Sequence, residues 1–107
     1  MDSLAETLSS AEIETVRRAL KATVEGSFFP DWEFETLIGV DRGTVQQVHE
    51  DWPIQTVDQA EFSCAVIGSM NSLIGYPHGK DDELAIYVPE GRSAIQEAMQ
   101  RLTSLGV

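Results

Sequence analysis

The chain has 107 residues, 42% of them hydrophobic, which suits one globular domain and is too apolar for a disordered chain. No apolar run approaches the roughly 18 residues that a membrane span needs, and the N-terminus lacks the basic and apolar regions of a secretory signal. Because Cys64 is the single cysteine, no internal disulfide can form, and we expect a cytoplasmic protein.

The net charge is −11, because eighteen acidic residues oppose seven basic ones. Most of the excess lies between residues 27 and 83, where the acids face only Arg42 and Lys80. A field of this sign repels phosphate backbones and anionic membranes, and it speeds encounter with basic proteins. The structural alternative is that the acids only keep a small protein soluble.

Three short patterns mark the starts of helices. In each, a serine or an aspartate can accept the free N–H groups of the first turn, and flanking apolar residues can close over the cap. The capping residues are Ser9, Asp41 and Asp58. After the first cap, apolar residues at helical spacing predict a helix over about 10–25 that stops at Gly26, and residues 1–8 are expected to form a flexible N-terminus.

The middle of the chain predicts three further helices. A short one should begin near Pro30, where proline suits the first turn, and should stop at Gly39. The next should span about 42–51 and be ended by Pro53. The fourth, over 59–74, is apolar around so much of its circumference that it should lie at the centre of the fold.

The C-terminal part combines a loop, an apolar run and a helix. Turn residues predict a loop through 75–83. The apolar run LAIYV (84–88) could form a short strand or a packed extended segment. We favour the extended segment, because a lone strand would lack a partner strand. If that run is exposed, it could also mediate homodimerisation. A last helix is expected over about 90–104. The predicted fold is therefore a single compact all-α domain, a bundle of about five helices with a short extended segment at 84–88.

Half of the chain's eight aromatic residues fall within FFPDWEF (28–34), where acids separate them. Phe34 belongs to a core stripe, and the two leading phenylalanines can fold back over the first helix. Trp32 lies on the opposite side from Phe34. Burial is the structural alternative for a tryptophan in a small domain, whereas an exposed one among acids would mark a binding site. The candidate partner-binding residues here are Asp31, Trp32 and Glu33.

The segment GYPHGKDDE (75–83) is the second candidate site, because loops on rigid scaffolds often carry binding residues. Its candidate residues are Tyr76, His78, Lys80, Asp81, Asp82 and Glu83. A metal-dependent enzyme could use His78 with these acids, but the spacing fixes no ligand geometry. No catalytic residue, metal or cofactor is therefore predicted, and a solvated turn is the structural alternative.

Residues 31–52, and 34–48 in particular, resemble the helix-turn-helix of bacterial repressors, with Gly39 at the turn. The resemblance implies that a second helix would enter the major groove of DNA. The residues that would face the groove are Arg42, Thr44, Gln46 and Gln47. Phosphate neutralisation supplies most non-specific affinity for DNA, and this helix holds one arginine followed by Glu50 and Asp51. Nucleic acid is thus the alternative partner.

The segments PDWEF (30–34) and NSLIGYPHGK (71–80) resemble the signatures of a group of small uncharacterised bacterial proteins, and this resemblance implies no activity. The charge and the exposed candidates favour a small acidic protein-binding module, of the type of bacterial immunity proteins or antitoxins, that inhibits a basic protein partner. A helix-turn-helix regulator is the alternative, and a metal-dependent enzyme comes third.

Overall fold

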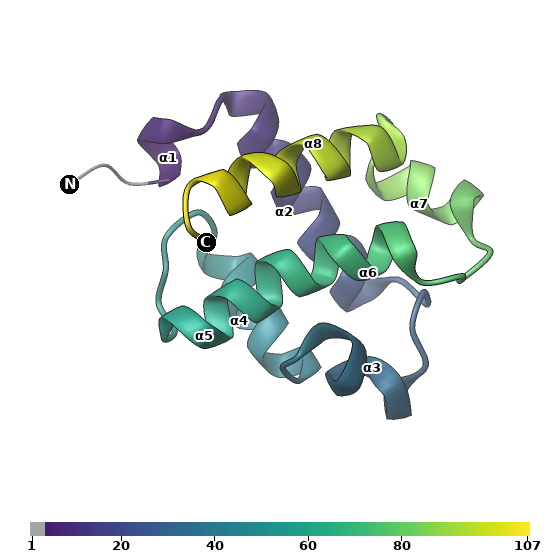
Figure 1. The fold of residues 1–107 in the computed structure, drawn as a ribbon. Coiled ribbons are helices and arrows are strands. Elements are labelled where there is room, and N and C mark those ends of the chain that lie inside the picture. Colours follow the sequence, from purple (N-terminus) through teal and green to yellow (C-terminus); the bar gives the residue numbers. More distant parts are fainter. Residues whose placement is uncertain (1–3) are drawn as a thin grey trace.

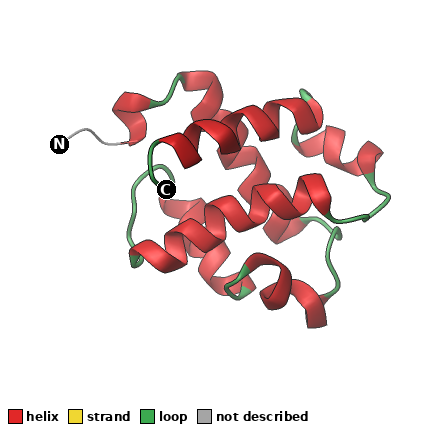
Figure 2. Cartoon of the chain, in the orientation of Figure 1, coloured by secondary structure: helices red, strands yellow, loops and turns green. Residues whose placement is uncertain are grey.

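The computed structural model describes residues 4–107, and within this range helices are joined by loops with no strand (Figures 1 and 2). The helices are α1 (Leu4–Thr7), α2 (Ser10–Glu25), α3 (Asp31–Ile38), α4 (Arg42–Asp51), α5 (Gln59–Ser63), the π-helical η1 (Cys64–Gly68), α6 (Ser69–Gly75), α7 (Asp81–Tyr87) and α8 (Gly91–Ser104). The predicted all-α class is confirmed. None of the helices in this range is long and apolar enough to cross a membrane.

The three predicted N-caps are present and fix where α2, α4 and α5 begin. The Ser9 hydroxyl accepts the Glu12 N–H at 3.1 Å, and the Glu12 carboxylate accepts the Ser9 N–H at 2.8 Å. Asp41 and Asp58 each accept the backbone N–H three positions on, both at 2.8 Å. Hydrogen bonds to these two carboxylates lower their pKa values, because they stabilise the charged form.

The core forms between α2 and the continuous helix of α5, η1 and α6. The helix α2 packs against α4, α6, α7 and α8, and α8 also covers α6 (Figure 1). The central position predicted for the fourth helix is therefore confirmed. The largest side chains with less than 2% exposure come from most of these elements: Phe62, Leu20, Met70, Leu73, Ile95 and Leu102.

The end of α3 lies against η1 at a very short distance. A Cβ atom built on Gly68 would come within 2.2 Å of the Ile38 carbonyl oxygen, so the approach requires a glycine. Ser72 donates a hydrogen bond to the Leu37 carbonyl at 3.2 Å. Gly39 then ends α3 with a φ of 103°, the left-handed conformation that glycine adopts without strain.

The extended segment predicted at 84–88 is wrong, because residues 84–87 belong to α7 and Val88 caps the end of this helix. Leu84 and Val88 are one helical turn apart and both are buried, whereas Ile86 between them is 78% exposed. The predicted loop also ends earlier than expected. Its three last acids, at 81–83, form the first turn of α7, where negative side chains favour the positive end of the helix.

The number of helices exceeds the predicted five, because α1 and α7 were missed and a π-helical turn divides the central helix. The flexible N-terminus was predicted over 1–8. Residues 1–3 of that segment lie outside the described range, but Leu4–Thr7 form α1. Leu8, with 5% of its surface exposed, belongs to the core. The N-terminal segment therefore contributes to the fold from residue 4 onward.

Candidate functional site

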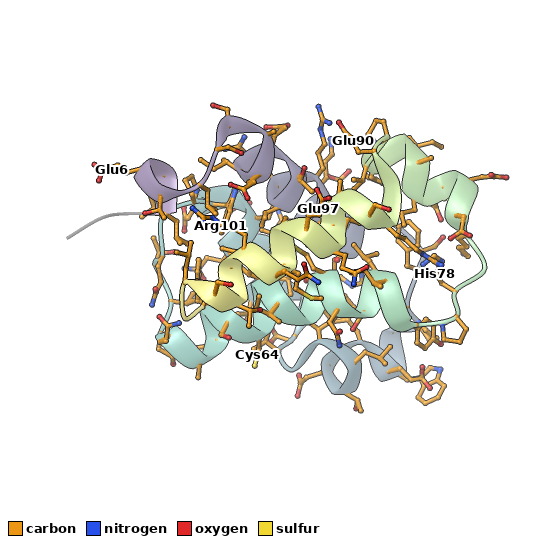
Figure 3. All side chains as sticks on the ribbon, turned by 45° about the horizontal axis from the view of Figure 1, so that its top comes forward. Glu6, Cys64, His78, Glu90, Glu97 and Arg101 are labelled. Atoms are coloured by element: carbon orange, nitrogen blue, oxygen red, sulfur yellow. The ribbon has the colours of Figure 1, made fainter. Side chains whose placement is uncertain are left out.

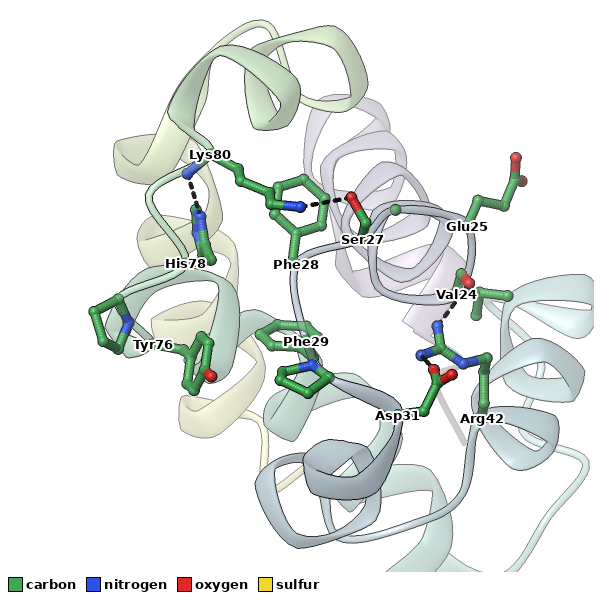
Figure 4. Close-up of a pocket in the computed structure, with 13 residues that line it drawn as sticks. Val24, Glu25, Ser27, Phe28, Phe29, Asp31, Arg42, Tyr76, His78 and Lys80 are labelled. Atoms are coloured by element: carbon green, nitrogen blue, oxygen red, sulfur yellow. Dashed lines mark hydrogen bonds and ion pairs between the residues drawn. The ribbon is translucent and has the colours of Figure 1, made fainter.

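The two candidate segments meet at one cleft of about 710 Å³ (Figure 4). It lies where the end of α2, the start of α3 and the loop between α6 and α7 come together. The lining residues include Glu25, Ser27, Phe28, Phe29, Asp31, Arg42, Tyr76, His78 and Lys80. The sequence predicted both segments as sites but did not predict that they share a cavity.

Aromatic rings join the two sides of the cleft. The ring of Phe29 meets that of Tyr76 edge-on at 5.6 Å between centroids, and Phe28 meets His78 in the same way at 5.0 Å. The Tyr76 hydroxyl donates to the Glu33 carboxylate at 3.0 Å, and this bond raises the pKa of Tyr76. Because both phenylalanines are buried, these rings act as structural supports for the cleft.

Hydrogen bonds to the backbone fix the orientation of the His78 ring. Its Nδ1 accepts the Lys80 N–H at 2.9 Å, and its Nε2 lies 3.1 Å from the Leu73 carbonyl oxygen. Arg92 Nη2 also approaches Nε2, at 3.5 Å. Both ring nitrogens are thus occupied, and no group of three or more metal-ligating side chains gathers anywhere in residues 4–107. Figure 3 shows that His78 and Cys64 also lie far apart on the molecule.

Arg42 connects three elements from inside the cleft. Its Nη1 donates to the carbonyls of Thr23 and Val24 at 3.2 and 2.9 Å, and its Nη2 pairs with Asp31 at 2.8 Å. Its guanidinium also lies 4.3 Å from the centroid of the Phe34 ring. The arginine that the helix-turn-helix interpretation assigned to DNA is therefore committed to the contacts between α2, α3 and α4.

The other three DNA-facing candidates lie on α4. Thr44 is half-buried, Gln46 donates a hydrogen bond to the Glu50 carboxylate at 2.9 Å, and Gln47 is exposed. The exposed side of α4 therefore presents the amide of Gln47 next to the carboxylate of Glu50, and such a surface does not attract the phosphates of DNA. DNA binding stays an untested alternative, and Arg42, the one cation among its four candidate residues, is engaged in contacts within the protein.

Trp32 is 80% exposed, so burial, the structural alternative, is wrong for this residue. It lies on α3, whose opposite side buries Phe34. Thr36, one helical turn on, lines a shallow groove of about 420 Å³ together with Gly75 and Pro77. Since residues four apart share a helix face, Trp32 lies on the same face of α3 as Thr36.

Asp31 lines the cleft, whereas Asp81 and Asp82 lie outside it in the first turn of α7, and the three acids differ in their pairing. The side chain of Asp31 is 94% exposed although it pairs with Arg42, and Asp81 is 71% exposed although it pairs with Arg92 at 2.8 Å. Asp82 is exposed and forms no hydrogen bond or ion pair with the residues that the structure describes, 4–107. A partner's cation could therefore reach all three carboxylates without displacing a buried group.

Ser27 was missed by the sequence interpretation but links the two sides of the cleft. Lys80 Nζ donates to the Ser27 hydroxyl at 2.8 Å, and this hydroxyl donates to the Glu83 carboxylate at 3.2 Å. The only signal in the sequence was its position directly after the glycine that ends α2. The candidate lysine thus donates to a group within the protein, and the Ser27 hydroxyl links it to Glu83.

The cleft and the groove beside Trp32 share Tyr76 in their walls, so they form one continuous candidate surface, which we call the α3 face. No protein-family model, no curated protein and no solved structure matches this chain. The resemblance of the two quoted motifs to a bacterial group stays a prediction. The α3 face is therefore interpreted from its own geometry.

Proposed function

We propose that this protein is an acidic protein-binding module that inhibits a basic protein, as bacterial immunity proteins and antitoxins do. The observation that carries this proposal is the 80% exposure of Trp32, on the same side of α3 as Thr36, which lines the α3 face. An indole in water contributes nothing to folding, whereas tryptophan is enriched among the residues that dominate binding energy. Its exposure is best explained by a partner that covers it.

The charges around Trp32 define the partner's chemistry. Glu35 is exposed on the same helix, and the exposed Asp82 lies at the start of α7, beyond the cleft. The cations of the cleft are satisfied internally, Arg42 by carbonyls and Asp31, and Lys80 by Ser27. The exposed carboxylates of Glu35 and Asp82 can therefore attract a basic surface, which would raise the association rate.

The expected mode of binding follows from these positions. An apolar side chain of the partner would pack on Trp32 and in the groove between Thr36 and Pro77. Lysine or arginine side chains would approach the carboxylates at the edges of the cleft, where pairs stay partly hydrated. The indole would then supply most of the affinity, and the acids would supply speed and selectivity.

The test is affinity capture from a lysate of the source cells at low salt, followed by elution with salt. Three baits are compared: the wild-type protein, Trp32→Ala, and Ile54→Ala as a matched control, since Ile54 is also exposed (68%). We expect one stoichiometric basic protein that binds to the wild type and to the Ile54 variant but not to the Trp32 variant. Capture of the same protein by all three baits, or of nucleic acid instead, would refute the proposal.

A further inference from the structure

A second cavity, of about 540 Å³, lies between α2, α4 and α7. We call it the α2–α7 groove; its lining residues are Glu14, Arg17, Arg18, Lys21, Glu25, His49, Ile86 and Tyr87. Burial lowers the pKa of His49 and favours its neutral form, and Arg18 also pairs with Glu90, beside the groove, at 3.4 Å. Three cations therefore face three carboxylates, and their charges cancel. The net charge of −11 arises elsewhere on the chain.

One cation and one carboxylate of the groove remain without an ion pair. Arg17 and Arg18 both contact the Glu14 carboxylate, at 2.7 and 3.4 Å. Lys21 and Glu25 are exposed, and neither forms a hydrogen bond or an ion pair with any residue that the structure describes. They lie one turn apart on α2 with the lysine first, which is the less favourable order for a pair within a helix. Both charges are therefore available to another molecule.

An apolar side chain lies in the same groove. Ile86 is 78% exposed although it belongs to a helix that Leu84 and Val88 fix to the core. Burial raises the pKa of the neighbouring Tyr87, and the charge of Glu25 adds to this effect, which places α7 close to the end of α2. Burial of Ile86 against another protein surface would be favourable. The groove thus combines an apolar contact with one available charge of each sign.

We propose that the α2–α7 groove binds the same groove of a second copy of this chain about a two-fold axis. In such a contact one surface serves on both copies, so it must be complementary to itself. Where two α2 helices meet antiparallel at the level of residue 23, Lys21 of each copy lies opposite Glu25 of the other. Ile86 of both copies then packs beside these two ion pairs. The inference concerns a different surface from Trp32 and does not depend on the proposed function.

The charge balance of the groove favours a second copy over a strongly charged partner. An acidic or a basic segment would meet like charges here as well as opposite ones, whereas a second copy supplies one charge of each sign at matching positions. Two copies that meet at this neutral surface also keep their acidic surfaces apart. Salt at physiological strength screens the repulsion between exposed charges beyond about 8 Å. The net charge of −11 is therefore compatible with a dimer through this groove.

The experiment is analytical ultracentrifugation of the purified protein over a range of concentrations at physiological salt. The dissociation constant of the dimer is measured for the wild type, Lys21→Glu, Glu25→Lys and Ile86→Ala. It is measured again for an equimolar mixture of the two charge variants, in which opposite charges return to both ion pairs. Ile54→Ala is the control, since Ile54 is also exposed (68%) but lies outside the groove. Trp32→Ala is measured in parallel to separate this groove from the α3 face.

We expect a wild-type dimer that each of the three groove variants weakens by about tenfold or more, because every substitution occurs twice across the axis. Glu25→Lys makes the chain less negative, so general repulsion cannot explain a loss in that variant. The mixture should recover the wild-type dissociation constant, and Ile54→Ala should keep it. A wild type that stays monomeric up to its solubility limit, or a mixture without recovery, would overturn the proposal. A dimer that only Trp32→Ala weakens would also overturn it, since the second copy would then occupy the α3 face.

Discussion

The two tryptophans lie in opposite environments. Trp52 is 4% exposed, donates its indole N–H to the Ile13 carbonyl at 3.0 Å, and stacks on Phe62 with 6.1 Å between centroids. Trp32 is 80% exposed and forms no hydrogen bond or ring contact within residues 4–107. The first joins α2, α4 and α5, whereas the second has no such contact with another described element.

The comparison separates the part of the molecule that folds from the part that we expect to bind. A buried tryptophan with a satisfied N–H contributes to stability through both area and hydrogen bonding. An exposed one contributes to neither, so its presence needs another explanation. Variants in the two regions should therefore differ first in stability and then in binding.

The largest effect is expected for Trp52→Ala. Removal of the buried ring leaves a cavity against Phe62, and we expect a loss of about 3–5 kcal/mol in the free energy of unfolding. Urea denaturation followed by circular dichroism measures this loss. Trp52→Phe, which keeps a ring but leaves the Ile13 carbonyl without its donor, should cost less. A loss below about 1 kcal/mol in Trp52→Ala would contradict the assignment of Trp52 to the core.

The next effect concerns the short distance between α3 and η1. Gly68→Ala would place a Cβ 2.2 Å from the Ile38 carbonyl oxygen, and overpacking of this kind costs about 1–3 kcal/mol. Gly75→Ala is the matched control, because nothing lies within 4 Å of its Cβ and alanine favours a helix by up to about 1 kcal/mol. Thermal unfolding of both should give changes of opposite sign. Equal changes in the unfolding temperature of the two variants would show that the short distance between Gly68 and Ile38 is not required for the packing of α3.

Arg42 lines the α3 face and also joins α2, α3 and α4, so a variant at this position tests whether the residue serves stability or binding. Arg42→Ala loses hydrogen bonds to two carbonyls and the contact with Phe34, and we expect a cost of about 2 kcal/mol. Arg17→Ala is the control, since its exposed pair with Glu14 should contribute less than about 1 kcal/mol. Urea denaturation distinguishes the two. Similar losses in the free energy of unfolding for both variants would mean that Arg42 does not stabilise the fold. Arg42 would then again be a candidate for contacts with DNA.

The smallest stability effect depends on pH. Burial, with smaller contributions from Lys21 and Arg17, lowers the pKa of His49 below its ordinary value of 6.5. The unfolded chain therefore binds the proton first, and the stability due to neutral His49 is complete above pH 6.5 and lost as the pH falls through the folded pKa. Denaturation at pH 7.5 and 5.5 should show a smaller pH dependence for His49→Gln than for the wild type. Equal slopes would contradict the lowered pKa.

Much of the fold could be predicted from the sequence because helix starts carry local signals. Ser9, Asp41 and Asp58 were recognised as caps from their neighbours, and all three accept the expected backbone hydrogen bonds. Helix α7 was missed because Leu84, Ile86 and Val88 alternate like a strand. The signals for a helix were the four-residue spacing of Leu84 and Val88 and the three acids before them.

The candidate site was predicted only as separate pieces. Trp32 could be placed opposite Phe34 from helical periodicity, but periodicity cannot show whether another element covers a side chain. The meeting of Ser27 with Lys80 joins residues 53 positions apart, and no local pattern encodes such a contact. The same holds for Arg42, whose partners lie on α2 and α3, so the sequence presented it as a free cation.

The most direct measurement is the affinity of the captured basic partner for Trp32→Ala by titration calorimetry, with the unfolding temperature measured on the same sample. We expect at least a tenfold loss of affinity, as for an interface hot spot, and a change in stability below about 0.5 kcal/mol. Unchanged affinity would contradict the assignment of the α3 face as the binding surface. A large fall in stability would instead contradict the contrast between Trp32 and Trp52.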